Sequence, residues 1–292
     1  MDVPDFSPWC LHSRWYASPV NLVDRIKMKV LWLTDIHLEF LDESGFSNFI
    51  RDLCNKNADA ILISGDIAQA STIGDYLSRM AQTLAIPVYF VLGNHDYYHG
   101  SILGVRANMT ALSKGSPHLH WLNVCGPVYL ASTTCLVGHD GWGDARLGNY
   151  HNSHVMLNDF LLISELAGLS AEERLQKLNH LGDEAAEHFQ TVLPEALRAT
   201  EHVVVLTHVP PFMEAAWYDG HYSDPDWLPF FSCKAVGDVL SEVMQKHQDK
   251  RMTVLCGHTH GGGASKILPN LVVLTGPAEY KHPAIQEIFE WG

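Results

Sequence analysis

The chain has 292 residues, 47% hydrophobic content and a formal net charge of -14. This length and apolar content are sufficient for one large domain with a real core. The acidic balance argues against a main role in gripping nucleic acid through its phosphates, although bound cations could still attract a small anionic substrate.

No segment is long and apolar enough to cross a membrane, so no membrane partner is expected. The six cysteines are scattered without CxxC spacing, which is typical of reduced thiols in a cytoplasmic protein. Residues 1–27 lack the basic start and apolar block of a secretory signal. We therefore expect an N-terminal extension over residues 1–27 and a single domain over residues 28–292. Met28, where the first apolar run begins, is also a candidate alternative start.

The first half of the domain reads as strands and helices in alternation. Continuous apolar runs predict buried strands at residues 29–34, 60–64 and 87–92. Apolar side chains at helical spacing predict helices at residues 46–55, 73–84 and 101–112. Strands that are buried on both faces and separated by helices imply a sheet layered with helices.

The pattern changes in the second half. Closely spaced short strands are expected at residues 118–122, 128–131 and 134–137, and later strands at 202–206, 252–256, 271–275 and 284–289. Residues 171–198 have the spacing of a helix, and residues 140–159 and 209–231 are expected to form long loops. The fold class is therefore α/β.

Polar residues with metal-binding chemistry follow five of the apolar runs. They are Asp35 and His37, Asp66, Asn94 with His95 and Asp96, His208, and His258 with His260. In layered sheets, sites form outside the carboxyl ends of strands. Residues two apart in an extended backbone point to the same side, so each of the pairs Asp35/His37 and His258/His260 could face one cation. The small Gly65 permits a tight exit from its strand and a close approach of backbone to metal.

The seven candidate ligands are Asp35, His37, Asp66, Asn94, His208, His258 and His260, which offer imidazole, carboxylate and amide oxygen but no sulfur. This set favours Mn, Fe, Zn, Co or Ni, and manganese is the metal we expect. Two carboxylates against two divalent cations would leave a net positive centre that attracts phosphate. Any one of these residues alone could be a turn or core residue. A turn or core role for each residue does not explain why all five stretches occur together and in this order.

With these motifs the chain resembles the calcineurin-like metallophosphoesterases, and in particular the broadly described bacterial phosphohydrolases among them. The family pattern is D-x-H, G-D, G-N-H-D/E, a lone H and G-H-x-H, and this sequence matches it from residue 35 to residue 260. The resemblance implies two facing mixed β-sheets in a sandwich flanked by helices. It also implies two divalent metal ions, one held by Asp35, His37, Asp66 and His260 and the other by Asp66, Asn94, His208 and His258.

The same resemblance implies hydrolysis of a small phosphate ester, in which a metal-bound hydroxide attacks phosphorus in line. His95 matches the catalytic histidine and would protonate the leaving alkoxide. Asp96 would orient His95 or a metal ligand, or would serve the structure alone. The sequence leaves open a phosphomonoester or a phosphodiester, the oligomeric state and the natural substrate.

Alternatives within and beyond the superfamily remain. The residues after Asp66, 67–70, depart from the pattern of the protein Ser/Thr phosphatases, whereas a cyclic-nucleotide phosphodiesterase shares the same core. A nuclease would need a basic groove, which the acidic composition does not favour. A non-catalytic scaffold would be expected to have lost ligands or His95, and this chain has kept them all.

Two segments could select the substrate. In residues 138–150, Arg146 could clamp a phosphate or pair with Asp140 or Asp144, and Trp142 could stack on a ring or, as we favour, fill a core edge. In residues 217–222 the aromatic side chains could form a rim or lid over the site, or a dimer surface. Residues 261–263 are three glycines, which would let the chain pass close to the site.

Overall fold

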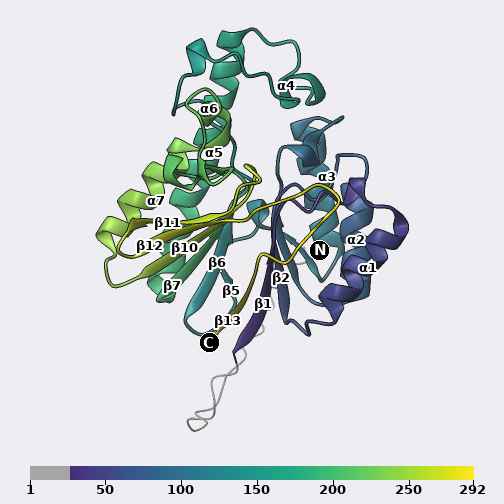
Figure 1. The fold of residues 1–292 in the computed structure, drawn as a ribbon. Helices are drawn as coiled ribbons and strands as arrows, with labels where there is room; N and C mark the ends of the chain where they lie inside the picture. Colours follow the sequence, from purple (N-terminus) through teal and green to yellow (C-terminus); the bar gives the residue numbers. More distant parts are fainter. Residues whose placement is uncertain (1–26) are drawn as a thin grey trace, which may run out of the picture.

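Two β-sheets face each other, and helices cover the outer face of each (Figure 1). The computed structural model describes residues 27–292. The predicted N-terminal extension lies outside the described residues except for Lys27, so it stays a prediction. The layered arrangement confirms the predicted fold class, an α/β sandwich of two mixed sheets.

The first sheet has the strand order β13-β1-β2-β3-β4. Its strands are β1 (Met28–Leu33), β2 (Ala60–Ser64), β3 (Val88–Val91), β4 (Leu119–Trp121) and β13 (Glu287–Trp291). Strands β1 to β4 are parallel, and β13 runs antiparallel along β1. Parallel neighbours need crossover connections, and these are the helices α1 (Glu43–Cys54), α2 (Ile73–Leu84) and α3 (Ile102–Gly115).

The second sheet has the order β11-β12-β10-β7-β6-β5. Its strands are β5 (Val128–Tyr129), β6 (Thr134–Gly138), β7 (His202–Leu206), β10 (Arg251–Cys256), β11 (Gly263–Leu268) and β12 (Leu271–Thr275). The inner four are parallel and the two edge strands are antiparallel. The long helices α5 (Ala171–Ala199) and α7 (Lys234–Lys246) pack together on its outer face (Figure 1).

Alternation along the central strands divides the core into three parts. In β2, Ile61 and Ile63 pack with helices α1 to α3, whereas Ala60 and Leu62 pack between the two sheets. Strand β7 alternates in the same way between the inter-sheet core and the core under α5 and α7. Because both faces of each sheet are covered, these strands are continuous apolar runs in the sequence.

Shorter elements lie in the connections. They are the 3₁₀ helices η1 (Leu38–Phe40), η2 (His95–Tyr97), η3 (Leu122–Val124), η4 (Tyr150–Asn152) and η5 (Met213–Ala215), the helices α4 (Asp159–Leu162) and α6 (Leu228–Phe231), and the hairpin of β8 (Trp217–Tyr218) and β9 (His221–Tyr222). The two expected loops therefore contain short regular elements. Strand β13 begins three residues later than expected, because its register is set by antiparallel pairing with β1.

Among the longer elements of the described residues, one helix and one strand had no predicted counterpart. Helix α7 was not predicted, although Val236, Val239 and Leu240 are buried at helical spacing. Strand β11 begins at Gly263, in the run of three glycines that indicated irregular backbone, and pairs with β12 at the edge of the sheet. Glycine weakens a strand prediction, but an edge position needs fewer packed side chains.

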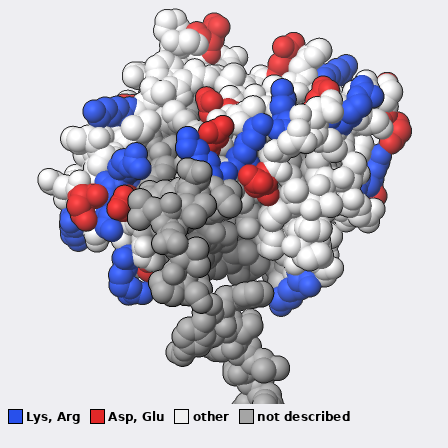
Figure 2. Space-filling view, turned by 90° about the horizontal axis from the view of Figure 1, so that it is seen from below, with Lys and Arg blue, Asp and Glu red and all other residues white. Residues whose placement is uncertain are grey.

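The charged surface is mixed. Figure 2 shows the end of the molecule where β1 begins, and on its visible described part Lys and Arg side chains are interspersed with Asp and Glu. Across residues 27–292, none of the helices has the length and apolar character needed to traverse a bilayer.

Candidate dinuclear metal centre

The five motifs lie at the carboxyl ends of β1, β2, β3, β7 and β10, where the two sheets meet. The chain leaving β1 runs beside the chain leaving β2, since the amides of Asp35 and His37 donate to the carbonyls of Gly65 and Asp66, each at 3.0 Å. The backbone ladder therefore continues beyond the strands. It brings side chains that are far apart in sequence to one place.

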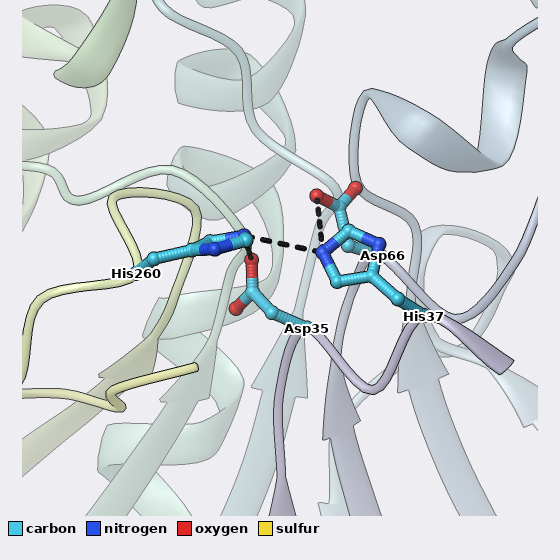
Figure 3. Close-up of side chains that lie close together, drawn as sticks. All are labelled: Asp35, His37, Asp66 and His260. Carbon is cyan, nitrogen blue, oxygen red and sulfur yellow. Dashed lines mark hydrogen bonds and ion pairs between the residues drawn. The ribbon is translucent and has the colours of Figure 1, made fainter. Parts of the chain in front are cut away.

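Four of the predicted ligands form one group, shown in Figure 3: Asp35, His37, Asp66 and His260. Their ligand atoms all lie within 4.8 Å of one another. His37 Nε2 lies 3.1 Å from His260 Nε2 and 3.8 Å from Asp66 Oδ2. His260 Nε2 lies 3.5 Å from Asp35 Oδ1. We call this group the first centre.

The other predicted ligands form a second group around Asp66. His208 Nε2 lies 3.4 Å from Asp66 Oδ1 and 3.2 Å from Asn94 Oδ1. His258 Nδ1 lies 3.0 Å from Asn94 Oδ1 and 3.1 Å from His208 Nε2. We call Asp66, Asn94, His208 and His258 the second centre. The two carboxylate oxygens of Asp66 face different centres, Oδ2 toward His37 and Oδ1 toward His208.

The donor set of the second centre fits a cation. His208 Nδ1 lies 2.8 Å from the Ser64 carbonyl, and His258 Nε2 lies 3.1 Å from the Phe230 carbonyl. A carbonyl accepts, so these nitrogens carry the protons and the opposite nitrogens turn lone pairs into the centre. Two lone pairs facing each other at 3.1 Å repel unless a proton or a cation lies between them.

Asn94 is oriented by two neighbours that the sequence did not indicate. Its amide nitrogen donates to Asp159 Oδ1 at 2.8 Å and contacts the hydroxyl of Tyr98 at 3.1 Å. The Tyr98 hydroxyl also donates to Asp159, at 2.8 Å. With the nitrogen held in this way, the amide oxygen of Asn94 points into the second centre. Asp159 is the last residue of the expected loop of residues 140–159, where no local pattern indicated a partner for Asn94.

The backbone at the ligands corrects one sequence argument. The expectation was that Asp35/His37 and His258/His260 converge through an extended backbone. Instead, these four residues have left-handed φ angles of 48°, 40°, 71° and 58°. Asp66 has φ 51°. Such angles cost about 1–2 kcal/mol per residue, and strain of this kind concentrates at functional sites. The sharp turns place Asp35 and His37 together in the first centre, whereas His258 and His260 do not face one group: His260 lies in the first centre and His258 in the second.

Glycine is required at two of these turns. Gly65 has φ +93°, and a Cβ there would lie 2.6 Å from His208 Nδ1. A Cβ at Gly93 would lie 2.1 Å from Asp66 Oδ1 and 2.6 Å from His208 Nε2, in the middle of the second centre. Gly65 and Gly93 therefore both lie against His208, a candidate ligand, and the close approach of Gly65 to a metal stays a prediction.

Electrostatics in the site are dominated by Asp66. Burial by itself lowers the pKa of His208, but the Asp66 carboxylate outweighs it and raises the pKa to about 10. For His258, burial and the neighbouring His208 together lower the pKa to about 3. The pKa values of two imidazoles of one centre are thus shifted in opposite directions, because His208 lies against the Asp66 carboxylate, whereas for His258 the effect of Asp66 is outweighed by burial and by His208.

His95 lies at the edge of the first centre. Its backbone amide donates to Asp66 Oδ1 at 2.9 Å, and its ring centroid is 4.6 Å from that of His37 and 4.3 Å from that of Tyr98. Burial lowers the pKa of His95, but the carboxylates of Asp66 and Glu39 outweigh it and raise the pKa to about 9. A protonated His95 is the form that a general acid requires.

Asp96 is buried behind the site. One carboxylate oxygen accepts from the backbone amides of Ile67 and Ala68, at 2.9 and 2.8 Å, and the other accepts from Gly93 at 2.8 Å. These bonds tie the loop that carries Asp66 to the loop that carries Asn94. They support a positioning part for Asp96 through the backbone. A direct catalytic part stays a prediction that these contacts do not favour.

A cleft of about 330 Å³ opens over the two centres. Its walls include Asp66, Asn94, His95, His258 and His260, together with aromatic side chains from several connections. The predicted rim at residues 217–222 contributes Tyr218.

In the first of the two candidate substrate segments, residues 138–150, the two side chains singled out make contacts within the fold. Arg146 pairs with Asp144 at 3.1 Å and with Asp183 at 2.8 Å, and Trp142 is 5% exposed and packs beside Tyr97. Of the two interpretations weighed for each residue, these contacts favour the structural one.

The fold and the site together define a class of protein: an α/β sandwich with two adjoining groups of candidate metal ligands around one shared carboxylate. A sequence model of the calcineurin-like phosphoesterases matches residues 28–262. The chain belongs to that family, which confirms the resemblance seen in the motifs.

Relatives agree with this assignment. An uncharacterized metallophosphoesterase of Helicobacter pylori is 32% identical over 108 residues, which are 34% of this chain and 29% of that protein. One of Campylobacter jejuni is 28% identical over 108 residues, with the same coverage of each chain. The matched part thus spans less than a third of the length of these curated relatives.

Solved structures show the same fold over nearly the whole chain. The phosphopantetheinyl hydrolase of Mycobacterium tuberculosis has a TM-score of 0.62 at 13% identity, covering 88% of this chain and 92% of that one. A dimetal phosphatase of Danio rerio has a TM-score of 0.57 at 15% identity, covering 89% and 90%. At these identities the likeness concerns the fold.

Proposed function

We propose that the chain is a phosphoric ester hydrolase that depends on two divalent cations and acts on a phosphomonoester or phosphodiester. The observation that carries this proposal is the position of Asp66 between two groups of ligands, one oxygen toward each. Family membership and the two hydrolases of similar fold support it.

The first centre would hold one cation through Asp35, His37, Asp66 and His260, and the second centre would hold the other through Asp66, Asn94, His208 and His258. Manganese is the proposed metal, because the donors are imidazole, carboxylate and amide without sulfur. When bound, two such cations supply charge neutralisation for phosphate oxygens and acidify a water molecule.

Proton donation to the leaving group is assigned to a side chain of the cleft. His95 lines it and stands beside Asp66, so we assign to His95 the proton that the leaving alkoxide needs. The rings of His37 and Tyr98 pack against His95 and limit its motion. A cytoplasmic location is part of this proposal and is supported by the scattered cysteines, which are free thiols in the described part of the chain.

The alternatives separate by substrate. A cyclic-nucleotide phosphodiesterase would use the same residues and remains the second candidate. A nuclease finds less support, since the net charge of -14 would oppose binding to a polyanion. A non-catalytic scaffold would have little need for strained backbone at the ligand positions.

A paired hydrolysis assay tests the proposal. The purified chain is stripped with a chelator, reloaded with Mn²⁺ and assayed on p-nitrophenyl phosphate and bis-p-nitrophenyl phosphate. We expect turnover only after reloading, with two equivalents of metal per chain, and the preferred ester identifies a monoesterase or a diesterase. Two bound equivalents without turnover of either ester would count against the hydrolase and favour the scaffold.

A further inference from the structure

A second cavity of about 240 Å³ opens beside the metal cleft. Its walls are Tyr218, Ser223, Asp224, Trp227 and Phe231. Three of these five residues, the aromatic ones, also line the metal cleft. One aromatic wall therefore serves both spaces, and we call the smaller space the aromatic pocket.

Large apolar surfaces of this wall are uncovered. Tyr218 is 60% exposed and Trp227 is 43% exposed, and the ring of Trp227 packs only partly, against Phe231 at a centroid distance of 5.3 Å. Isolated exposed aromatics need no explanation, but a cluster that borders a cleft of catalytic ligands indicates a binding surface.

The charges around the two spaces exclude one kind of ligand. Apart from the metal ligands and His95, the charged side chains among the described lining residues are Asp159 and Asp224. Neither Lys nor Arg is among those lining residues. Asp159 is engaged with Asn94 and Tyr98, and Asp224 accepts the amide of Asp226 at 2.8 Å. A second phosphate or a carboxylate would meet acidic neighbours and no cation besides the metals.

We propose that the aromatic pocket receives the leaving group of the substrate, and that this group is an uncharged ring, aryl or heterocyclic. The inference rests on the proposed function, because the metal centres must hold the phosphoryl group. Stacking on Trp227 and Tyr218 would hold the ring, and the acidic neighbours would reject leaving groups with a second negative charge.

Three esters test this selectivity with the Mn²⁺-loaded chain: phenyl phosphate, 4-carboxyphenyl phosphate and glycerol 2-phosphate. We expect kcat/KM for phenyl phosphate to exceed that for the carboxylated ester about tenfold or more. In Trp227→Ala, KM for phenyl phosphate should rise about tenfold with kcat retained, which is the size of one lost stacking contact. Its KM for glycerol 2-phosphate should not change.

The matched control is Tyr129→Ala, which removes a 52% exposed aromatic from β5 at the edge of the second sheet. Tyr218→Ala gives a second test should Trp227→Ala fold poorly. Turnover without preference among the esters, unchanged in both pocket variants, would overturn the pocket while leaving the hydrolase intact. A change of oligomeric state in Trp227→Ala would also overturn it. Absence of turnover on all three esters would instead contradict the proposed function.

A different observation concerns Glu39 in η1. Its side chain is 9% exposed, and neither carboxylate oxygen has a hydrogen-bond partner among the described residues. Glu39 Oε1 lies 3.7 Å from His37 Nδ1 and 3.9 Å from His95 Nδ1. Both of these ring nitrogens are buried and lack a hydrogen-bond partner within residues 27–292. The Glu39 carboxylate and the two Nδ1 atoms thus face one another without hydrogen bonds. A buried polar group without a hydrogen bond destabilises the folded state.

We infer that Glu39 is a positioning residue that accepts the Nδ1 protons of His37 and His95. A small closure would bring both contacts to hydrogen-bond length. With Nδ1 of each ring bonded to Glu39, Nε2 of His37 would face the first centre and Nε2 of His95 would face the leaving group. The same three side chains could hold a third cation, but His37 would then bind a metal through each ring nitrogen and lose both protons.

Glu39→Gln tests this inference, because a neutral amide oxygen accepts hydrogen bonds more weakly than a carboxylate oxygen, and Glu39 Oε1 faces both imidazoles. We expect kcat for glycerol 2-phosphate to fall about 10–100-fold with two metals still bound. For p-nitrophenyl phosphate, whose phenolate leaves without a proton, the loss should be several-fold smaller. In a His95→Ala background, Glu39→Gln should add little.

Glu43→Gln is the control, since that exposed carboxylate in α1 pairs only with Arg79 among the described side chains. An equal loss of kcat on both esters, or a loss of one metal equivalent, would show that Glu39 only stabilises the structure of the site. Either result would overturn the inference. A third equivalent that disappears in Glu39→Gln would establish the cation site instead.

Discussion

Asp66→Asn is expected to remove both the activity and at least one of the two bound metals. The carboxylate turns one oxygen toward each centre, and an asparagine would offer one oxygen and one amide donor. One centre would then face two hydrogens in place of a ligand. Since substitutions behind a metal ligand already cost about 10–100-fold, a bridging ligand should cost more. We expect kcat/KM to fall by more than about 100-fold on either p-nitrophenyl ester.

Metal content measured by mass spectrometry on the purified variant gives the second readout. Asp52→Asn is the matched control, because Asp52 lies exposed on α1 and should change neither quantity. Retention of two tightly bound equivalents and of activity in Asp66→Asn would show that Asp66 does not bridge. The two-centre interpretation would then have to be abandoned.

His95→Ala is expected to lower kcat without releasing metal. His95 lines the cleft but its ring lies outside the two ligand groups, so the centres should remain loaded. Loss of a general acid costs about 10²–10⁴-fold. We expect a loss in that range for glycerol 2-phosphate. The loss should be much smaller for p-nitrophenyl phosphate, whose leaving group needs no proton.

His180→Ala, on an exposed position of α5, is the control for removing an imidazole. Equal losses on the two esters in His95→Ala would argue against proton donation and for a role in binding the phosphate. Loss of a metal equivalent would make His95 a ligand.

The position of the site could be predicted because its signals are local. Each ligand follows a run of apolar residues, and a run buried on both faces identifies a central strand without knowledge of its neighbours. Helix α1, α2 and α5 likewise followed from apolar side chains at helical spacing. Helix α7 has the same kind of spacing and could have been found. Strand β11 could not, because its glycine start is stabilised only by pairing with β12.

The supporting contacts could not be predicted, because each joins residues far apart in the chain. Asn94 is oriented by Asp159, 65 positions later. Glu39 lies two residues after the first motif, yet the role we infer for it depends on His95, which follows the end of β3. The sequence leaves Asp96 to orient His95 or a metal ligand or to serve the structure alone, and only the fold shows that its side chain accepts from the backbone of Ile67 and Gly93.

The sequence by itself determined the kinds of ligand, their order and their location at strand ends, since motif spacing and strand periodicity are properties of short segments. The division of the ligands into two centres around Asp66 was implied by the family resemblance and not by the spacing of the residues, because it depends on how two sheets face each other. Only the tertiary structure decided the left-handed backbone at Asp35, His37, His258 and His260. Such conformations are unfavourable locally and persist only where surrounding contacts hold them.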